Sequence, residues 1–320
     1  MRRLERQLHR LERHLAVQAA RAAGTNIGKC EQPWIQGSGR LFPGGDGLLD
    51  PVEFSRRAFG HQHWGVQADI LRSVATNPRT AVKACHASGK TFCAAAAVLW
   101  WITAHPDGIA VTTAPTWTQV ERVLWGEIRK SLGQSRIHYP QPTRTRLELG
   151  PNRYAMGLST NEGVRFQGWH GKILIVIDEA PGVRPDIFEA IEGIRAGGDV
   201  RVLALGNPVI SSGPFYDSFS VNREAWSLFT IGAFDTPNLA GLDLESLLAL
   251  SEDELDHTVR PYLTTRRWVK EKYLEWGPGH ASWESRVLGN FPKQAQDALI
   301  SLRRCAGCLA ALHSPPKPQL

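Results

Sequence analysis

Residues 84–91, Ala-Cys-His-Ala-Ser-Gly-Lys-Thr, constrain the fold more than any other part of the sequence. They match the phosphate-binding loop of nucleotide-hydrolysing proteins, except that Ala84 stands where glycine is usual. A short apolar strand is predicted before them, over Thr80–Cys85, and a buried helix after them, over residues 90–104. Such a loop wraps backbone N–H groups around a phosphate at the start of a helix. This context predicts a P-loop nucleotide-binding domain.

The residues of this loop have distinct expected roles. Lys90 is expected to contact the β- and γ-phosphates of ATP, and the Thr91 hydroxyl to bind Mg²⁺. The Gln67 amide, upstream of the loop, has the donor and acceptor needed to read an adenine edge, although an exposed helical glutamine is an equally good interpretation. The full set of candidate nucleotide-binding residues is Gln67, Ala84, Cys85, His86, Ala87, Ser88, Gly89, Lys90 and Thr91.

A second apolar segment, Ile173–Ile177, leads directly into two carboxylates. Five consecutive β-branched or leucine residues are typical of a strand buried on both faces. Asp178 and Glu179 follow at its carboxyl end, where parallel sheets bind their ligands. We expect Asp178 to hold Mg²⁺ together with Thr91, and Glu179 to act as the general base on the attacking water. The plainer alternative is a strand that ends in two solvated acids.

Three further features are weaker candidates. Asn207 follows another predicted strand and is expected to sense the phosphate or the attacking water, although Gly-Asn-Pro is also a good turn sequence. Arg165 is the candidate for an arginine that stabilises transition-state charge in its own or a neighbouring subunit, with Arg195 and Arg201 as alternatives. Residues 113–119 are either a nucleic-acid contact or a capped helix start.

Strand and helix signals alternate along the chain, which predicts an α/β fold with a mainly parallel sheet covered by helices. The expected strands are 80–85, 108–113, a hairpin or strand pair within 147–160, 173–177 and 200–205. The expected helices are 61–76, 90–104, 116–132, 185–196, 243–256 and 266–276. The expected division of the chain is a basic amphipathic helix over 1–24, a linker over 25–60, the ATPase domain over 61–296 and an irregular tail over 297–320.

Composition narrows the functional classes. The 320 residues carry a formal net charge of +6, which favours polyanionic partners or is a surplus spread over the surface. No apolar run approaches the roughly 18 residues of a membrane helix, and no secretory signal is recognisable. Five unevenly spaced cysteines favour a reducing cytoplasm, and the isolated Cys305 and Cys308 pair does not predict a zinc site.

Taken together and in order, several segments resemble the ATPase domain of phage terminase large subunits: 84–91, 112–119, 166–170, 177–180, 206–208 and 213–216. The resemblance spans roughly residues 60–296. It implies the α/β fold of RecA-like (ASCE) P-loop NTPases. It also implies a ring-forming motor in the host cytoplasm that docks on a portal protein, works with a terminase small subunit and drives double-stranded DNA into a prohead. By the family's pattern Lys90 and Thr91 bind ATP, Asp178 binds Mg²⁺, Glu179 is catalytic and Asn207 couples hydrolysis to motion.

Full-length members of that family also carry a C-terminal RNase H-like nuclease. Residues after Asp297 contain no carboxylate side chain, so DNA cleavage is not expected from this chain. Two other interpretations remain open at this point. A helicase-like nucleic-acid-dependent ATPase shares the phosphate loop and the Asp-Glu pair but needs a second RecA-like lobe, and an inactive prophage remnant would keep the fold without turnover.

Overall fold

The computed structural model describes residues 50–158, 169 and 171–293. The chain divides into two units, Met1–Gln36 and Gly37–Leu320, and all described residues belong to the second. The predicted basic helix over 1–24, most of the linker, Arg165 and the tail over 297–320 lie outside the described residues. Within the described part, no helix combines the length and the apolar character that crossing a membrane requires.

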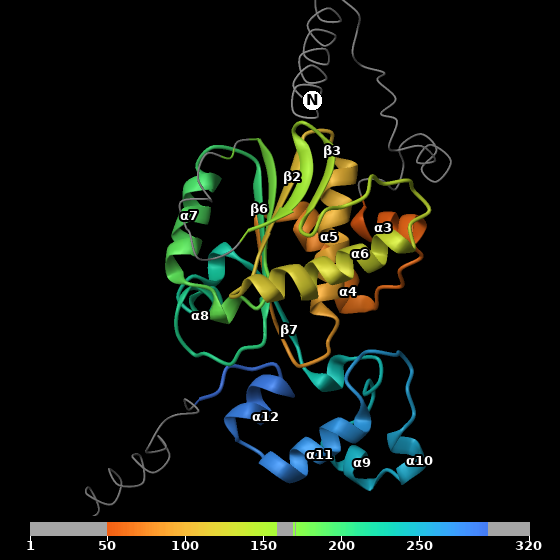
Figure 1. Cartoon of the computed structure of the whole chain (residues 1–320). Helices are drawn as coiled ribbons and strands as arrows, with labels where there is room; N and C mark the ends of the chain where they lie inside the picture. The colour runs from red at the N-terminus through yellow and green to blue at the C-terminus, as the bar shows by residue number, and fades with distance from the viewer. Residues whose placement is uncertain (1–49, 159–168, 170, 294–320) are drawn as a thin grey trace, which may run out of the picture. The chain divides into compact units, whose positions relative to one another are not determined.

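A seven-stranded sheet organises the second unit, with strand order β3-β4-β2-β5-β6-β1-β7 (Figure 1). Every neighbouring pair is parallel except β3 and β4, which form an antiparallel hairpin at one edge. The predicted mainly parallel α/β sheet is therefore confirmed. The strands are β1 (Arg79–Ala84), β2 (Gly108–Thr113), β3 (Arg146–Gly150), β4 (Arg153–Gly157), β5 (Lys172–Ile177), β6 (Val200–Gly206) and β7 (Ser227–Ile231).

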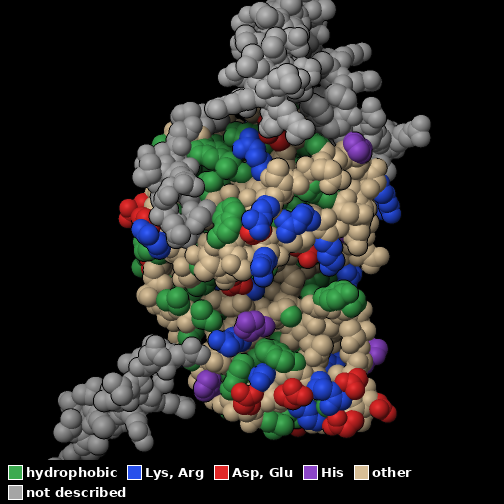
Figure 2. Space-filling view, viewed as in Figure 1, with side chains coloured by type: hydrophobic (Ala, Val, Ile, Leu, Met, Phe, Trp, Pro, Cys, Tyr) green, Lys and Arg blue, Asp and Glu red, His purple; other side chains and the backbone are tan. Residues whose placement is uncertain are grey.

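Helices cover both faces of this sheet. The helices α4 (Gly65–Thr76), α5 (Lys90–Ala104) and α6 (Trp125–Gly133) lie on one face, and α7 (Pro185–Arg195) lies on the other (Figure 1). Helix α5 is buried along almost its whole length because four consecutive alanines, 94–97, let it approach the sheet closely. Basic side chains gather on this face of the molecule in Figure 2. In α6 and the π-helix before it (Gln119–Leu124), Arg122, Arg129 and Lys130 are exposed.

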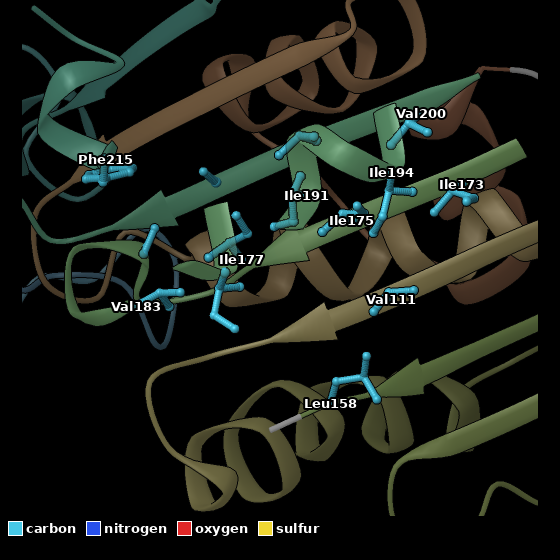
Figure 3. Close-up of a cluster of buried hydrophobic side chains, with 14 of the residues drawn as sticks. Val111, Leu158, Ile173, Ile175, Ile177, Val183, Ile191, Ile194, Val200 and Phe215 are labelled. Atoms are coloured by element: carbon cyan, nitrogen blue, oxygen red, sulfur yellow. The ribbon is translucent and has the colours of Figure 1, made fainter. Parts of the chain in front are cut away.

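The core between the sheet and α7 explains why β5 is so apolar. Ile173, Ile175 and Ile177 lie on the face of β5 that packs against α7 (Figure 3). Leu174 and Val176 alternate with them and are also fully buried. The strand is thus covered on both faces, as the sequence predicts. Asp178 and Glu179 follow directly where this buried strand ends.

The folded domain begins earlier than expected. Residues 51–59, which the sequence analysis included in the linker, form helix α3 (Pro51–Phe59) with Phe54 and Phe59 in the core. Asp50 caps this helix, since its Oδ1 accepts from Val52 N at 2.8 Å and Glu53 N at 3.1 Å. Proline at the first helical position and Gly60 beyond the last are further helix signals. The linker assignment is therefore wrong for these nine residues.

Two predicted helices are interrupted in the structure. The segment 116–132 contains a π-helix (Gln119–Leu124) before α6, and 243–256 forms two short helices, α9 (Leu244–Ala249) and α10 (Glu252–Leu255). The break between the short helices occurs where Ser251 caps α10. Strand β7 and the helices α8 (Pro214–Asp217) and α12 (Ala281–Arg286) were not expected, whereas the predicted α11 (Arg266–Trp276) is confirmed.

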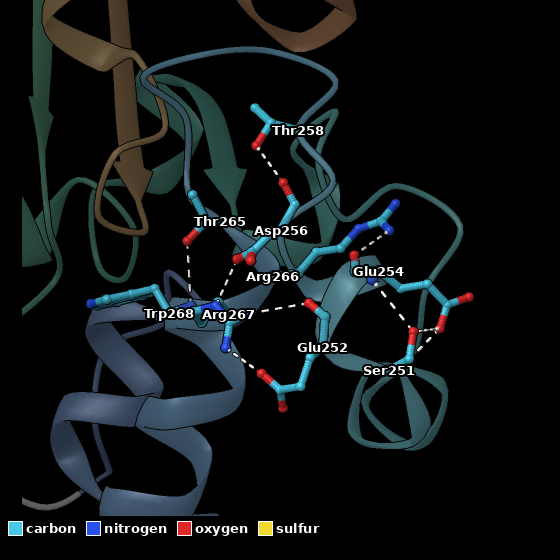
Figure 4. A network of polar contacts seen from close by, with 9 residues as sticks. All are labelled: Ser251, Glu252, Glu254, Asp256, Thr258, Thr265, Arg266, Arg267 and Trp268. Carbon is cyan, nitrogen blue, oxygen red and sulfur yellow. Dashed lines mark hydrogen bonds and ion pairs between the residues drawn. The ribbon is translucent and has the colours of Figure 1, made fainter.

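Polar contacts join the helices of the C-terminal segment. Arg267, in α11, donates from Nη1 to Glu252 Oε2 at 2.6 Å and from Nε to Asp256 Oδ1 at 2.7 Å (Figure 4). These bonds connect α11 to the two ends of α10. Because all three side chains are at least partly exposed, their contribution to stability is modest.

Candidate functional site

The carboxyl ends of three parallel strands bring two of the predicted catalytic residues, Glu179 and Asn207, together with Lys90. In the β-ladders Ile177 lies opposite Ala204, and Val82 opposite Leu205, so the residues after β1, β5 and β6 share one edge. Lys90 Nζ lies 3.0 Å from Asn207 Oδ1 and 3.3 Å from Glu179 Oε1. The structure therefore places Lys90, Glu179 and Asn207, which are separated by up to 117 residues, in direct contact.

The predicted metal ligands also meet. The Thr91 hydroxyl donates to Asp178 Oδ2 at 3.3 Å, and the other oxygen of Asp178 accepts from Glu179 N at 3.1 Å. Asp178 is almost fully buried, and this burial, together with the negative charge of Glu179, raises its pKa to about 6 against the opposing charge of Lys90. A divalent cation beside it would favour the ionised carboxylate.

The donors at this position suit Mg²⁺. A hydroxyl and a carboxylate oxygen are hard ligands of the kind that this ion prefers, and Mg²⁺ usually completes its octahedron with water and substrate phosphates. Among the described residues no group of three or more His, Cys, Asp or Glu side chains forms a ready-made metal cage. Thr91 and Asp178 thus fit a magnesium ion carried in with a nucleotide.

The phosphate loop divides into a supporting half and a half that lines the cavity. The amides of Cys85 and His86 already donate to the carbonyls of Ile231, at 2.7 Å, and Arg286, at 2.9 Å. Ala84 and Cys85 are fully buried, and Ala84 O accepts from Asn207 Nδ2 at 2.6 Å. These three predicted nucleotide-binding residues therefore bond to the rest of the protein and hold the loop on the side away from the cavity.

The alanine at the first loop position causes no backbone strain. The described non-glycine residues with positive φ are Ala87, Glu179 and Tyr262, so Ala84 keeps an ordinary negative φ. Glycine is needed instead at Gly89, which has φ +79° and whose added Cβ would lie 2.4 Å from Gln67 Nε2. The departure from the usual loop sequence at Ala84 is thus compatible with the loop conformation.

A cavity of about 740 Å³ opens in front of the loop, a size typical of small-molecule sites. Ser88 Oγ is buried and has no hydrogen-bond partner within the described part of the chain, so its hydroxyl is available to a ligand. The loop side of the cavity fits a phosphate chain, with Lys90 and the start of α5 supplying positive charge. The lining residues are Ala87 to Phe92 on that side and Gln62, Trp64, Gln67, Glu127, Lys130 and Val259 to Leu263 on the others.

Gln67 lies beneath the phosphate loop. Its side chain is almost fully buried, with Nε2 3.4 Å from Gly89 O and 3.5 Å from Ser88 O. Its Oε1 accepts from Trp64 N at 3.4 Å. Both ends of the amide thus face protein backbone, and the adenine contact expected from the sequence remains a prediction.

The candidate arginines are not gathered at this edge of the sheet. Arg165 lies outside the described residues. Arg201 is the second residue of β6, so about 20 Å of strand separates it from Asn207 at the other end. Arg195 ends α7 and donates to Glu192 Oε2 at 2.6 Å, and Arg201 pairs with Asp199 at 3.3 Å. Neither of these alternatives reaches the Lys90 site of its own chain.

The segment 113–119 has the geometry of a capped helix start. Gln119 Oε1 accepts from the backbone N of Thr116 at 3.0 Å and from its hydroxyl at 2.8 Å. This confirms the local structural interpretation of the segment. Trp117 is 40% exposed, and a nucleic-acid contact there remains a prediction.

Sequence reasoning missed the C-terminal residues that complete the site. Thr264 donates from its backbone N to Ala87 O at 3.0 Å and from its hydroxyl to His86 O. The segment Val259–Leu263 lines the cavity, and Asn238 bonds to its backbone. These residues carry no local motif, because their role depends on contacts with residues far away in the sequence.

Known proteins share this architecture. Two solved structures share it: the large terminase ATPase domain of Thermus phage P74-26 (TM-score 0.51, 16% identity, covering 76% of this chain and 99% of that one) and the large terminase of another thermophilic bacteriophage (TM-score 0.51, 14% identity, covering 72% and 54%). The chain has the fold of a large-terminase ATPase domain.

The sequence comparison gives the same family name. The terminase-like chain is 31% identical over 129 residues to a probable terminase large subunit of Enterobacteria phage P7. That match covers 40% of this chain and 22% of the phage P7 protein, so the chain is aligned with about a fifth of that relative's length. No protein-family model matches the chain. The resemblance to phage large terminases that the sequence motifs indicate is thereby confirmed.

Proposed function

We propose that this chain is the ATP-hydrolysing motor domain of a large terminase and that it translocates double-stranded DNA into a prohead. The observation that carries the proposal is the contact of Lys90 with both Glu179 and Asn207 at the edge of the sheet where the phosphate loop lies. A phosphate-binding cation, a carboxylate and an amide meet there in front of a cavity of suitable size. This is the arrangement that nucleotide hydrolysis requires.

In the proposed mechanism the chain's own residues divide the work. The amides of the cavity-lining half of the loop and Lys90 bind the phosphates, which frees Glu179 from its ion pair with Lys90. Glu179 then accepts a proton from the attacking water, and Asn207 hydrogen-bonds that water or the γ-phosphate. Thr91 and Asp178 would hold Mg²⁺, which would neutralise charge on the phosphates when bound.

The partners of this motor follow from the same proposal. We expect it to act as a homo-oligomeric ring in the host cytoplasm, on a portal protein and with a terminase small subunit. Because Arg195 and Arg201 lie away from the Lys90 site, the arginine that stabilises transition-state charge would be Arg165 or a residue of a neighbouring subunit. The net charge of +6 and the exposed basic side chains over α6 suit a DNA partner.

Steady-state ATP hydrolysis by the purified chain, with and without duplex DNA, tests the proposal. Wild-type protein should turn over ATP in the presence of Mg²⁺, and duplex DNA should accelerate turnover. Glu179→Gln should bind nucleotide with near wild-type affinity and lose hydrolysis by about two to four orders of magnitude, the range typical of a general base.

The matched control is Glu192→Gln, which alters an exposed carboxylate of α7 away from the cavity and should leave hydrolysis unchanged. A Glu179→Gln variant that hydrolyses ATP at the wild-type rate would exclude Glu179 as the base. Duplex strand separation by the wild-type chain would favour the helicase alternative. Absence of turnover at high protein concentration would favour the inactive remnant.

A further inference from the structure

We propose that the segment Val259–Leu263 forms the base-side wall of the nucleotide cavity and that Asn238 is the positioning residue that holds this wall in place. The inference rests on the proposed function, because the occupant of the cavity is taken to be a nucleotide. It assigns the base and ribose end of that nucleotide to residues near the C-terminus of the domain.

The shape of the cavity determines where the base must go. Ala87 to Phe92 line one side, and Val259 to Leu263 line another. A nucleotide whose phosphates occupy the loop side therefore extends its ribose and base towards the rest of the cavity. Gln67 has both ends of its amide directed at backbone groups, so it offers the base little hydrogen-bonding capacity.

Tyr262 supplies a flat surface at this wall. Its side chain is 89% exposed, and its ring centre lies 5.1 Å from Lys130 Nζ, which also lines the cavity. An exposed aromatic ring at the mouth of a nucleotide cavity is suited to stacking on a purine. Tyr262 gains this position through a left-handed backbone conformation, with φ +66°.

Such a conformation is unfavourable for a residue with a Cβ and persists only where the surrounding structure imposes it. Asn238 provides much of that constraint. Its Oδ1 accepts from Val259 N at 2.9 Å and Arg260 N at 2.7 Å, at the start of the segment. Its Nδ2 lies 3.5 Å from Leu263 O and 3.1 Å from Thr264 O, at the end. One side chain, only 1% exposed, thus holds both ends of a short loop.

Two further tethers connect this wall to the rest of the cavity. Arg260 donates from Nη1 to Gln62 O at 2.6 Å, and Thr264 N donates to Ala87 O at 3.0 Å. The wall is therefore tied to the segment before α4 and to the phosphate loop itself. A segment held at both ends, with a strained residue at its tip, is preorganised for a ligand rather than assembled around it.

The test compares two ligands that differ only in the part the wall would contact. Equilibrium affinities for ATP and for inorganic triphosphate are measured on the full chain with Mg²⁺ present. Tyr262→Ala should weaken ATP about tenfold, the scale of one lost stacking contact, and should change triphosphate affinity by less than about twofold. Asn238→Asp keeps the size and the acceptor but points a charged oxygen at the carbonyls of the wall, so it should show the same selective loss.

A general loss of stability is separated from this effect by Ile191→Ala. Ile191 is a core residue of α7 on the opposite face of the sheet, so its variant should lower the melting temperature without changing the ratio of ATP to triphosphate affinity. If Asn238→Asp does not fold, Tyr262→Ala still decides the matter, because its side chain is exposed.

Each outcome has a defined meaning. Selective loss of ATP affinity in the two variants supports the assignment of Val259–Leu263 as the base-side wall. Wild-type ATP affinity in Tyr262→Ala, or an equal loss of both ligands in both variants, would overturn the inference and leave the proposed function intact. Failure of the wild-type chain to bind ATP at all would overturn the proposed function, and this inference with it.

Discussion

Glu179 combines a predicted catalytic role with an unusual backbone. It has φ 49° and ψ 44°, in the left-handed region that residues with a Cβ rarely adopt. This conformation turns the chain sharply at the end of β5 and leaves the Glu179 carboxylate 3.3 Å from Lys90 Nζ. Backbone strain of this kind, of order 1–3 kcal/mol, is found where function requires a particular side-chain position.

At Asn207 the structure adds side-chain contacts to the turn that the sequence indicates. The side chain bonds Lys90 through Oδ1 and Ala84 O through Nδ2, so it is more than a turn residue. We expect Asn207→Ala to lower ATP turnover at least tenfold, because Lys90 loses a partner that orients it, while nucleotide affinity changes less. Comparing kcat with nucleotide affinity checks this. Asn207→Asp, which keeps the acceptor for Lys90, serves as the control and should retain more turnover than the alanine variant.

Gly89 allows a prediction about stability at the same scale. Gly89→Ala should lower the free energy of unfolding by at least about 1–2 kcal/mol, because its φ of +79° disfavours any Cβ and the new atom would collide with Gln67. The control is Gly193→Ala in α7, where a Cβ meets nothing within 4 Å and alanine favours a helix. Urea unfolding of both variants should show opposite signs, and a neutral Gly89→Ala would contradict the loop geometry.

At the scale of elements, the segment between α3 and α4 contains two histidines, of which His61 is buried and His63 is partly buried. Burial lowers the pKa of His61 to about 4, with a smaller contribution from the charge of Lys130. Burial also lowers the pKa of His63 to about 4, reinforced by His61 and Arg260 and opposed by Gln67. Both rings bond to Ser55 Oγ at 2.9 Å. The two side chains are therefore neutral in the folded protein at neutral pH.

These pKa values predict acid sensitivity. In the unfolded chain histidine titrates near pH 6.5, so between about pH 6.5 and pH 4 the unfolded state binds more protons and the free energy of unfolding falls as the pH falls. Each histidine contributes a slope of up to about 1.4 kcal/mol per pH unit in that window. His61→Gln cannot take up the proton, so its unfolding free energy should fall less steeply. An identical slope in the variant and the wild type would contradict this.

The elements that the sequence predicts well are those whose signal is local. Strand β5 is covered on both faces and reads as an uninterrupted apolar run, and the helix after the phosphate loop follows from the loop itself. Strand β7 pairs only with β1 at the sheet edge and is half-exposed along most of its length, so its residues show no clear alternation. Helix α3 has good start signals in Asp50 and Pro51, but the glycine-rich stretch before it favours a linker.

The same distinction applies to the candidate site. Lys90, Thr91, Asp178 and Glu179 belong to local sequence patterns, and the structure brings them together as expected. Asn238 and the other C-terminal residues of the site act through contacts across long sequence separations, for which one sequence contains no signal. The division of the phosphate loop into two halves was also beyond prediction, since it depends on carbonyls of β7 and α12.

At the scale of the whole domain, Thr264 connects the phosphate loop to the C-terminal helices. It bonds the loop at two successive carbonyls and immediately precedes the cap of α11. We expect ATP to protect the backbone amides of α11 from hydrogen exchange, because a ligand that orders the loop also orders what is bonded to it. Thr264→Val removes the hydroxyl bond and should reduce that protection by at least about threefold.

Ser251→Ala is the control for this experiment. It removes the cap of α10, which belongs to the same C-terminal segment but does not contact the phosphate loop. In this variant the backbone amides of α10 should exchange faster, while the ATP-induced protection of α11 should remain at the wild-type level. Equal protection of α11 in Thr264→Val and wild type would show that the loop and the C-terminal helices respond to nucleotide independently.

The amides of Cys85 and His86 face away from the cavity and are bonded to carbonyls of Ile231 and Arg286. The loop can therefore be disturbed from the side opposite the cavity. A small molecule that displaced the Arg286 carbonyl from the His86 amide would deform the phosphate loop from the side opposite the cavity. Its inhibition would persist at saturating ATP, so a screen for such compounds should be run at high nucleotide concentration, where competitive inhibitors are hidden.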